Sequence, residues 1–166
     1  MPLIRLFLDI ALFGKGPQDL PESRLLLFLV VLANLAVGIA LSAMQSGWVE
    51  GALQSAVGVA LLAAFLGTAL YLSSKLPRFL QSATAALGCD TLIGAIAVPL
   101  LVWIRLVPEG AGVASLPLMF LMLWQVAMIG HILRHALSIT FIAGFGLALA
   151  YTIVSYRIIM VLFPQG

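Results

Sequence analysis

Hydrophobic residues dominate five long segments of the chain, and short polar or turn-rich stretches separate these segments. Each segment is close to the about 20 apolar residues that an α-helix needs to cross the hydrocarbon core of a bilayer. The pattern therefore predicts an all-α, polytopic helical membrane protein with five transmembrane helices. The predicted spans cover about residues 24–44, 51–72, 82–104, 116–136 and 137–157.

A shorter amphipathic segment, residues 1–13, precedes the first span. Phe7 and Ile10 lie with other apolar residues on one face of a predicted helix. Arg5 and Asp9 lie away from that face. The segment is too short to cross a bilayer, so we predict an interfacial helix in the headgroup layer. It lacks a small-residue cleavage motif, so we do not expect a cleaved signal peptide.

The composition favours lipid as the surrounding solvent. Hydrophobic residues make up 63% of the 166 residues and charged residues only 8%, whereas soluble domains carry about 25% charged residues. The mean hydropathy is +1.20. A water-soluble core of this size could not bury so many apolar side chains, so we expect a single membrane domain over residues 1–166. A net charge of +2 is too small to suggest a nucleic-acid partner.

The positions of the basic residues predict the orientation of the spans. If the N-terminus is cytoplasmic, six of the 8 Lys and Arg residues lie on the cytoplasmic side, and Arg105 and Arg157 lie outside. We therefore expect a cytoplasmic N-terminus and a periplasmic C-terminus in a bacterial inner membrane. The third span contains Asp90 and Pro99, so a re-entrant or broken helix is the alternative for that segment.

Asp90 is the most informative polar residue, because a carboxylate at mid-membrane costs about 2.5 to 3.5 kcal/mol on insertion scales. In the predicted topology Asp90 and His131 lie at the same depth, about 12 Å from the cytoplasmic surface. We predict an intramembrane polar cluster in which Asp90 pairs with His131 or Arg134, with His135 beside them. Such a cluster is either a structural clamp between the third and fourth spans or a proton or ion relay.

The same residues suggest a metal site as a further alternative. His131 and His135 have the i, i+4 spacing at which two imidazoles can share a metal, with Asp90 as a third ligand. Arg134 would repel a cation, and the sequence HILRH lacks the glutamate of an HExxH motif, so we predict no bound metal. No serine has a GxSxG context and no GxxxxGK[ST] loop is present, so we predict neither catalytic residues nor a cofactor. The single cysteine, Cys89, excludes an internal disulfide.

Three further polar residues at membrane depth, Asn34, Gln125 and Tyr151, form a possible polar path. The alternative is an ordinary interhelical hydrogen bond at each, worth about 0.6 kcal/mol on average. We also expect small residues to mark close contacts between helices, because they let two backbones approach. The predicted helix-packing residues are Ala56, Ala60, Ala64, Gly94 and Gly144.

From Ala85 to Tyr151 the chain resembles the C-terminal part of a Yip1-domain protein. The resemblance rests on a small and apolar third span ending near Pro99, the tract Leu123-Trp124-Gln125-Val126, the pair Gly130-His131, the basic Arg134, and Ala136 at the start of the last span. It implies five membrane spans and a cytoplasmic N-terminus, but no activity. The DLYGP-type signature of eukaryotic members is absent, and residues 89–92 stand in that region without its Gly-Pro. A role in trafficking through small GTPases therefore does not follow.

Two functions remain open from the sequence. The first is a non-enzymatic, Yip1-like scaffold or accessory subunit of a larger membrane assembly, because loops are minimal and several helix faces carry small residues. The second is a small oligomeric transporter or channel, or a lipid-handling protein, that uses the polar site at Asp90. An intramembrane enzyme would need a serine or metal centre that the sequence does not show. The expected partners are membrane lipids, together with other membrane subunits or further copies of the chain.

Overall fold

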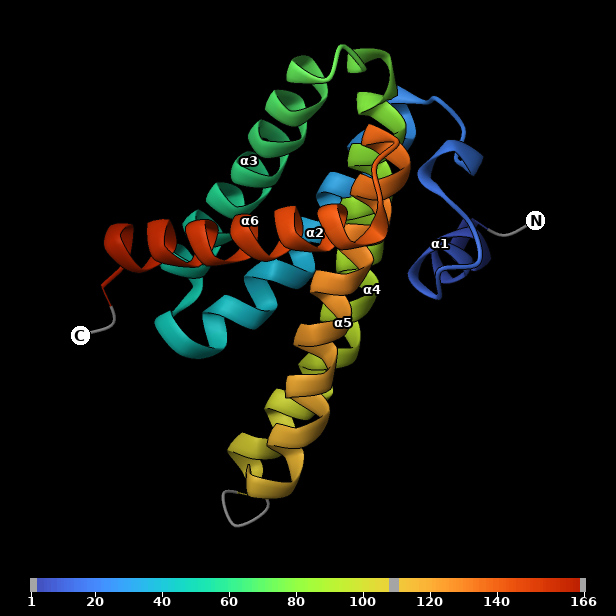
Figure 1. The fold of residues 1–166 in the computed structure, drawn as a ribbon. Coiled ribbons are helices and arrows are strands. Elements are labelled where there is room, and N and C mark those ends of the chain that lie inside the picture. The colour runs from blue at the N-terminus through green and yellow to red at the C-terminus, as the bar shows by residue number, and fades with distance from the viewer. Residues whose placement is uncertain (1–2, 108–110, 165–166) are drawn as a thin grey trace.

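The computed structural model describes residues 3–107 and 111–164. Within these residues the chain is all-α, and five of its helices are long and apolar enough to cross a membrane (Figure 1). The predicted fold class and the predicted number of spans are therefore confirmed. The helices are α1 (Leu3–Ala11), α2 (Arg24–Ser46), α3 (Trp48–Leu72), α4 (Phe79–Leu106), α5 (Ala111–Leu137) and α6 (Phe141–Leu162).

The antiparallel pairs α2–α3 and α4–α5 pack on each other through α2 and α4, and α6 packs on α5. In Figure 1, α4 and α5 run along each other, whereas α6 starts beside α5 and runs away from this pair toward α3. The middle of α6 contacts α3 through the rings of Phe65 and Tyr151, which stack with centroids 4.7 Å apart. Within α6 only Gly144 and Ala148 are buried, so most of its surface faces outward.

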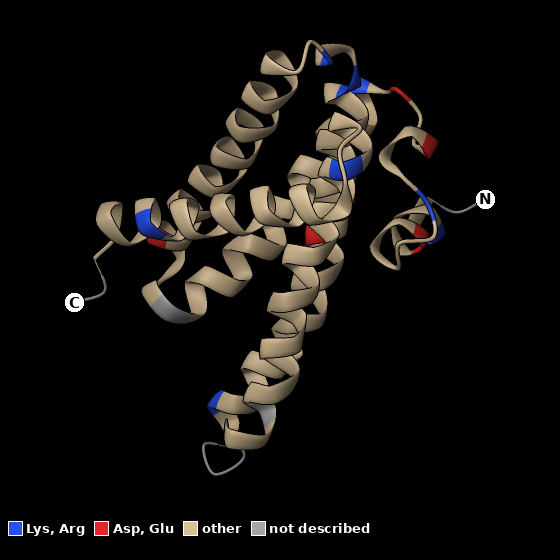
Figure 2. Cartoon of the chain, viewed as in Figure 1, with Lys and Arg blue, Asp and Glu red and all other residues tan. Residues whose placement is uncertain are grey.

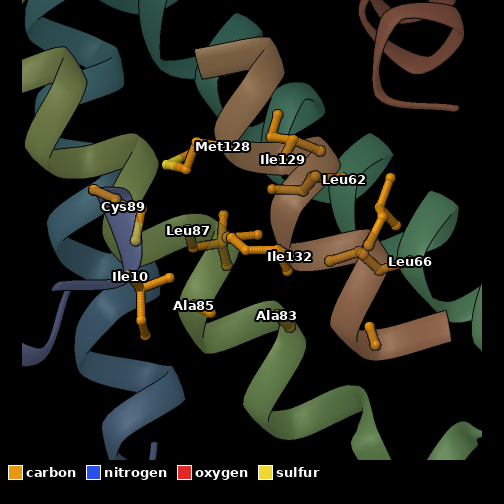
Figure 3. Packing of buried hydrophobic residues seen from close by; sticks show 14 of the residues in the cluster. Ile10, Leu62, Leu66, Ala83, Ala85, Leu87, Cys89, Met128, Ile129 and Ile132 are labelled. Carbon is orange, nitrogen blue, oxygen red and sulfur yellow. The ribbon is translucent and has the colours of Figure 1, made fainter. Parts of the chain in front are cut away.

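The core lies where the first half of α4 packs against the second half of α5. Every residue of α4 from Ser82 to Cys89 is buried. Met128 and Ile132 of α5 belong to the same cluster of buried side chains (Figure 3). Leu66 of α3 lies on one side of this cluster and Ile10 of α1 on the other. Residues from four helices, including the short N-terminal one, therefore form the tightest part of the molecule.

The third span is one continuous helix. α4 runs for 28 residues and contains Pro99 in its interior. The alternative of a re-entrant or broken helix is therefore wrong. A proline removes one backbone donor, which membrane helices tolerate when the surroundings adjust. Pro99 lies on an exposed side of α4, where its ring takes no space from the core.

The last span covers Phe141–Leu162 rather than 137–157. Ser138 has a φ of 53°, a left-handed conformation that cannot continue the preceding helix. Thr140 then caps α6, because its hydroxyl accepts a hydrogen bond of 3.3 Å from the backbone N–H of Ala143. The hydrophobic pattern alone does not reveal this turn, because apolar residues continue on both sides of it.

The amphipathic helix α1 packs on its own bundle. The sulfhydryl of Cys89 donates to the backbone oxygen of Phe7 over 3.4 Å, and a Cβ at Gly88 would overlap the Phe7 ring. The indole N–H of Trp124 donates to the backbone oxygen of Ala11 over 2.8 Å. The apolar face that we predicted for this segment therefore covers α4 and α5. Its location in the headgroup layer stays a prediction.

Two of the predicted helix-packing residues, Gly94 and Gly144, lie at close contacts between helices. A Cβ at Gly94 would come within 2.8 Å of Val37 Cγ1, so a side chain at position 94 would force Val37 or the α2–α4 contact to shift. A Cβ at Gly144 would overlap the backbone oxygen of Gly130, which brings α6 directly onto α5. Both contacts have the form expected of small residues at a membrane helix interface.

The alanine ridge of α3 does not pack against other helices of the same chain. Ala56, Ala60 and Ala64 are exposed, and α3 instead turns larger residues such as Leu66 and Leu70 toward the core. A leucine makes many more contacts than an alanine when it is buried. A row of alanines permits a close approach but does not require one.

The charged residues support a membrane location. Figure 2 shows most Lys, Arg, Asp and Glu residues at the ends of the long helices and around α1, with long uncharged stretches between. Each of the five long helices contains an 18-residue window with a mean hydropathy of 1.8 or more. The chain is therefore an integral membrane protein.

Candidate functional site at Asp90

Asp90 lies on α4 where this helix faces both α2 and α5. The side-chain amide of Asn34 on α2 donates a hydrogen bond of 2.8 Å to Asp90 Oδ2. The side-chain amide of Gln125 on α5 donates to the other carboxylate oxygen, Oδ1. One carboxylate therefore joins three helices through two amide donors.

The surroundings of Asn34 fix the orientation of its amide. The residue is only 8% exposed. Its Nδ2 also donates to the backbone oxygen of Leu87 over 3.2 Å and to Thr91 Oγ1 over 3.3 Å. The Thr91 hydroxyl donates its own hydrogen to the Leu87 oxygen over 2.7 Å, so it accepts from Asn34. Because every neighbour of the amide nitrogen is an acceptor, Asn34 turns its N–H groups toward Asp90.

The predicted pairing of Asp90 with His131 or Arg134 is wrong. His131 is buried, and its Nε2 lies 2.9 Å from the backbone oxygen of Lys15. Arg134 is exposed. Gln125 is the α5 residue at the level of Asp90, and His131 lies about 9 Å further along the helix. The depth argument from the sequence therefore placed His131 too close to Asp90 by about 1.7 helical turns.

His131 and His135 do lie together, with ring centroids 4.6 Å apart. They lie near the C-terminal end of α5, where His131 contacts Phe13 and Lys15 in the turn that follows α1. Lys75 Nζ donates to the last backbone oxygen of α5, and Arg78 Nη1 donates to the backbone oxygens of His135 and Ala136, each over 3.1 Å. These bonds satisfy carbonyls that a helix end leaves without partners. The predicted cluster is therefore split into a carboxylate site and a basic helix end.

No cationic side chain neutralises Asp90 in the part of the chain that the structure describes. The one ion pair among the described residues joins Lys15 Nζ to Asp9 Oδ2 over 3.1 Å and does not involve Asp90. An ionised carboxylate only accepts hydrogen bonds, and an N–H donor on each of its two oxygens matches that form. The site therefore supplies hydrogen bonds to the carboxylate but no positive charge.

Two cavities meet at this carboxylate. The larger has a volume of about 380 Å³ and lies between α2, α4 and α5. The smaller has a volume of about 200 Å³ and reaches toward α3 and α6. Four residues line both cavities: Asn34, Gly38, Asp90 and Gln125. The polar side chains therefore lie between two cavities, and the larger one opens to the surface of the bundle at the exposed Met122.

The smaller cavity brings Tyr151 and Ser55 to the same place. All three residues of the possible polar path, Asn34, Gln125 and Tyr151, thus lie around Asp90. The sequence analysis did not group these residues with Asp90, because a sequence does not show how each helix is rotated about its axis. It missed Ser55 and Thr91, small hydroxyl residues of a kind common throughout membrane helices.

Among residues 3–107 and 111–164, no three His, Cys, Asp or Glu side chains lie close enough together to hold a metal ion. In particular, the amides of Asn34 and Gln125, rather than the two histidines, surround Asp90. The site is best described as one carboxylate, two amides and adjoining space.

No protein-family model, curated protein or solved structure matches this chain. The class of protein is therefore defined by the fold and the site. It is an α-helical integral membrane protein with five apolar helices and a carboxylate within the third of them.

Proposed function

We propose that the protein is a small, non-enzymatic membrane transporter for a monovalent cation, with Asp90 as the group that binds the cation. The observation that carries this proposal is the environment of the carboxylate. Each of its oxygens accepts a hydrogen bond from an amide, and two cavities adjoin it. Within the described residues it has no positive partner. A cation entering from a cavity would supply the missing charge.

The cost of placing the Asp90 carboxylate in a membrane helix also supports a functional role for it. A carboxylate at mid-membrane costs about 2.5 to 3.5 kcal/mol, whereas a typical interhelical hydrogen bond in a membrane contributes about 0.6 kcal/mol. A neutral polar side chain at position 90 could link α2 to α5 at a lower cost. Ionisable groups inside membrane helices commonly mark ion or substrate pathways for this reason.

A complete pathway requires more than one copy of the chain. The two cavities meet at Asp90, but their lining residues do not extend to both ends of the helices. α6 has only two buried residues, Gly144 and Ala148, so a large apolar surface is free for self-association. An oligomer is therefore part of the proposal.

Flux in proteoliposomes tests the proposal. One carboxylate holds either a proton or one monovalent cation, so entry of a cation should release a proton in exchange. Vesicles containing the full chain and a trapped pH-sensitive dye receive pulses of sodium, potassium or guanidinium chloride. We expect at least one cation to raise the internal pH with the wild-type chain and to have no effect with Asp90→Asn.

Glu22→Gln is the matched control for charge removal. Glu22 is exposed and lies outside the helices, so this variant should transport like the wild type. Wild-type flux equal to that of empty vesicles for all three cations would reject transport. Flux that survives in a folded Asp90→Asn variant would show that the carboxylate is not the binding group.

A second candidate function is a scaffold or accessory subunit of a larger membrane assembly. The outward surface of α6 favours it, since a partner helix could cover that surface. The resemblance to Yip1-domain proteins is compatible with this role. Native mass spectrometry of the chain extracted into lipid nanodiscs separates the two candidates. Other polypeptides at fixed stoichiometry would support an accessory subunit, whereas a pure homo-oligomer would support the transporter.

For orientation, we propose a cytoplasmic N-terminus, a periplasmic C-terminus and a bacterial inner membrane. The excess of basic residues near one end supports this choice. Lys75 and Arg78 both bond to the C-terminal end of α5, and the Lys15 backbone bonds to His131 near that end. These basic residues therefore lie at one end of the bundle.

A further inference from the structure

The larger cavity at Asp90 combines a polar end with apolar walls. Its polar groups are the side chains of Asn34, Asp90 and Gln125. The rest of its lining is formed by glycine, alanine and larger apolar residues of α2, α4 and α5. Its volume of about 380 Å³ lies within the range of pockets that hold small organic ligands. The cavity therefore suits a molecule with one polar end and one apolar end.

The polar end of the cavity is rich in acceptors. A carboxylate offers about four acceptor positions, and the two amides fill two of them. Asn34 and Gln125 donate to Asp90 through their amide nitrogens, and no described residue donates a hydrogen bond to either side-chain oxygen. A positively charged group with several N–H donors would satisfy the carboxylate and both of these oxygens.

A divalent metal ion fits the cavity poorly. Calcium takes six to eight oxygen ligands, and magnesium demands an octahedral set. Here the side chains supply one carboxylate and two amide oxygens, and apolar residues form the rest of the lining. The walls would instead bury the hydrocarbon part of an organic cation, which contributes about 25 cal/mol for each Å² removed from water.

We propose that the larger cavity binds a monovalent organic cation that carries N–H groups on an apolar chain, such as an alkylguanidinium or alkylammonium ion. This proposal rests on the proposed function in that Asp90 is the cation-binding group, and it names the class of substrate. The cationic head lies against Asp90 and the two amide oxygens. The chain lies along the apolar walls, which include Leu41 and Leu121.

Thermal unfolding of the purified full chain in detergent micelles tests the ligand class. The probe is octylguanidinium, and its comparison compounds are octyltrimethylammonium, which has the charge without N–H groups, and octanol, which has neither. A ligand that binds the folded state raises the unfolding temperature. We expect octylguanidinium to raise it most, with at least tenfold tighter binding than octyltrimethylammonium.

Two variants locate the binding. Asp90→Asn should weaken octylguanidinium binding at least tenfold, whereas Glu22→Gln, which removes an exposed carboxylate, should bind like the wild type. Ala97→Phe keeps the carboxylate but fills part of the cavity that Ala97 lines, and it should also weaken binding. If Asp90→Asn does not fold, the comparison of Ala97→Phe with the wild type still decides the matter.

Equal binding of octylguanidinium by the wild type and a folded Ala97→Phe would overturn the proposal, as would equal binding of all three probes by the wild type. These outcomes are separate from the flux result. Asp90-dependent flux without octylguanidinium binding would keep the transporter and reject the ligand class. Binding without flux would keep the ligand site and reject transport.

Discussion

Asn34 and Asp90 lie 56 positions apart in the sequence and are joined by a hydrogen bond of 2.8 Å between α2 and α4. The bond runs from an amide N–H to a carboxylate oxygen, so its strength reports the charge state of Asp90. Hydrogen bonds to charged groups contribute about 1.5 to 3 kcal/mol, compared with about 1 kcal/mol for neutral pairs. This difference makes the pair a direct probe of the site.

A double-mutant cycle measures this bond. Asn34→Ala, Asp90→Ala and the double variant are unfolded in mixed micelles, and the coupling free energy is taken from the four stabilities. For an ionised Asp90 we expect a coupling of at least about 1 kcal/mol, above the roughly 0.6 kcal/mol average for membrane hydrogen bonds. A coupling near zero would contradict an energetically significant bond. Thr152→Ala paired with Asn34→Ala is the control and should be additive, because Thr152 bonds only to its own helix.

The sequence predicts a buried polar site at Asp90, but it does not predict the partners of this residue. A carboxylate in an apolar segment stands out in any hydropathy pattern, and Asn34 and Gln125 stand out as polar residues at similar depth. Which polar groups meet depends on how each helix is rotated and where it crosses its neighbours. Depth along one axis favoured His131, whose ring instead bonds to the backbone of Lys15. That contact depends on how the segment after α1 folds back, which periodicity does not describe.

The small residues likewise show that the sequence identifies candidate packing positions but not which of them pack in the folded chain. Gly94 and Gly144 were identified as packing positions, and both lie at close helix contacts. Ala56 was identified by the same reasoning but faces outward. The spacing of residues in the sequence shows which faces of a helix carry small side chains. The choice among those faces depends on the larger side chains that the core must also accommodate.

Gly144 and Gly146 form a matched pair for testing the contact between α5 and α6. Gly144→Ala should destabilise the protein by about 1 to 3 kcal/mol, because the new methyl group would overlap the backbone oxygen of Gly130. Gly146→Ala has no atom within 4 Å of the added Cβ, so it should be neutral or slightly stabilising. Unfolding in mixed micelles measures both. Equal effects of the two substitutions would show that α6 does not touch α5 as described.

Ile10 and Ile4 form a second matched pair, which tests the docking of α1. Ile10 is fully buried, whereas Ile4 is 64% exposed on the same helix. Ile10→Ala should cost about 2 to 5 kcal/mol of local stability and release α1 from α4. Hydrogen exchange of the α1 amides should therefore accelerate in Ile10→Ala and remain unchanged in Ile4→Ala. Similar exchange rates in both variants would contradict the docked position of α1.

The proposed orientation predicts which ends of α2 a water-soluble reagent can reach. Glu22 and Val49 are both exposed, and they lie just beyond the two opposite ends of α2. In a Cys89→Ala background, Glu22→Cys should react with a membrane-impermeant maleimide in inside-out vesicles, and Val49→Cys should react in right-side-out vesicles. The chain with its natural Cys89 is the control and should react in neither preparation, because this thiol is fully buried. The reverse pattern would invert the orientation, and labelling of both positions from one side would show that α2 does not cross the membrane.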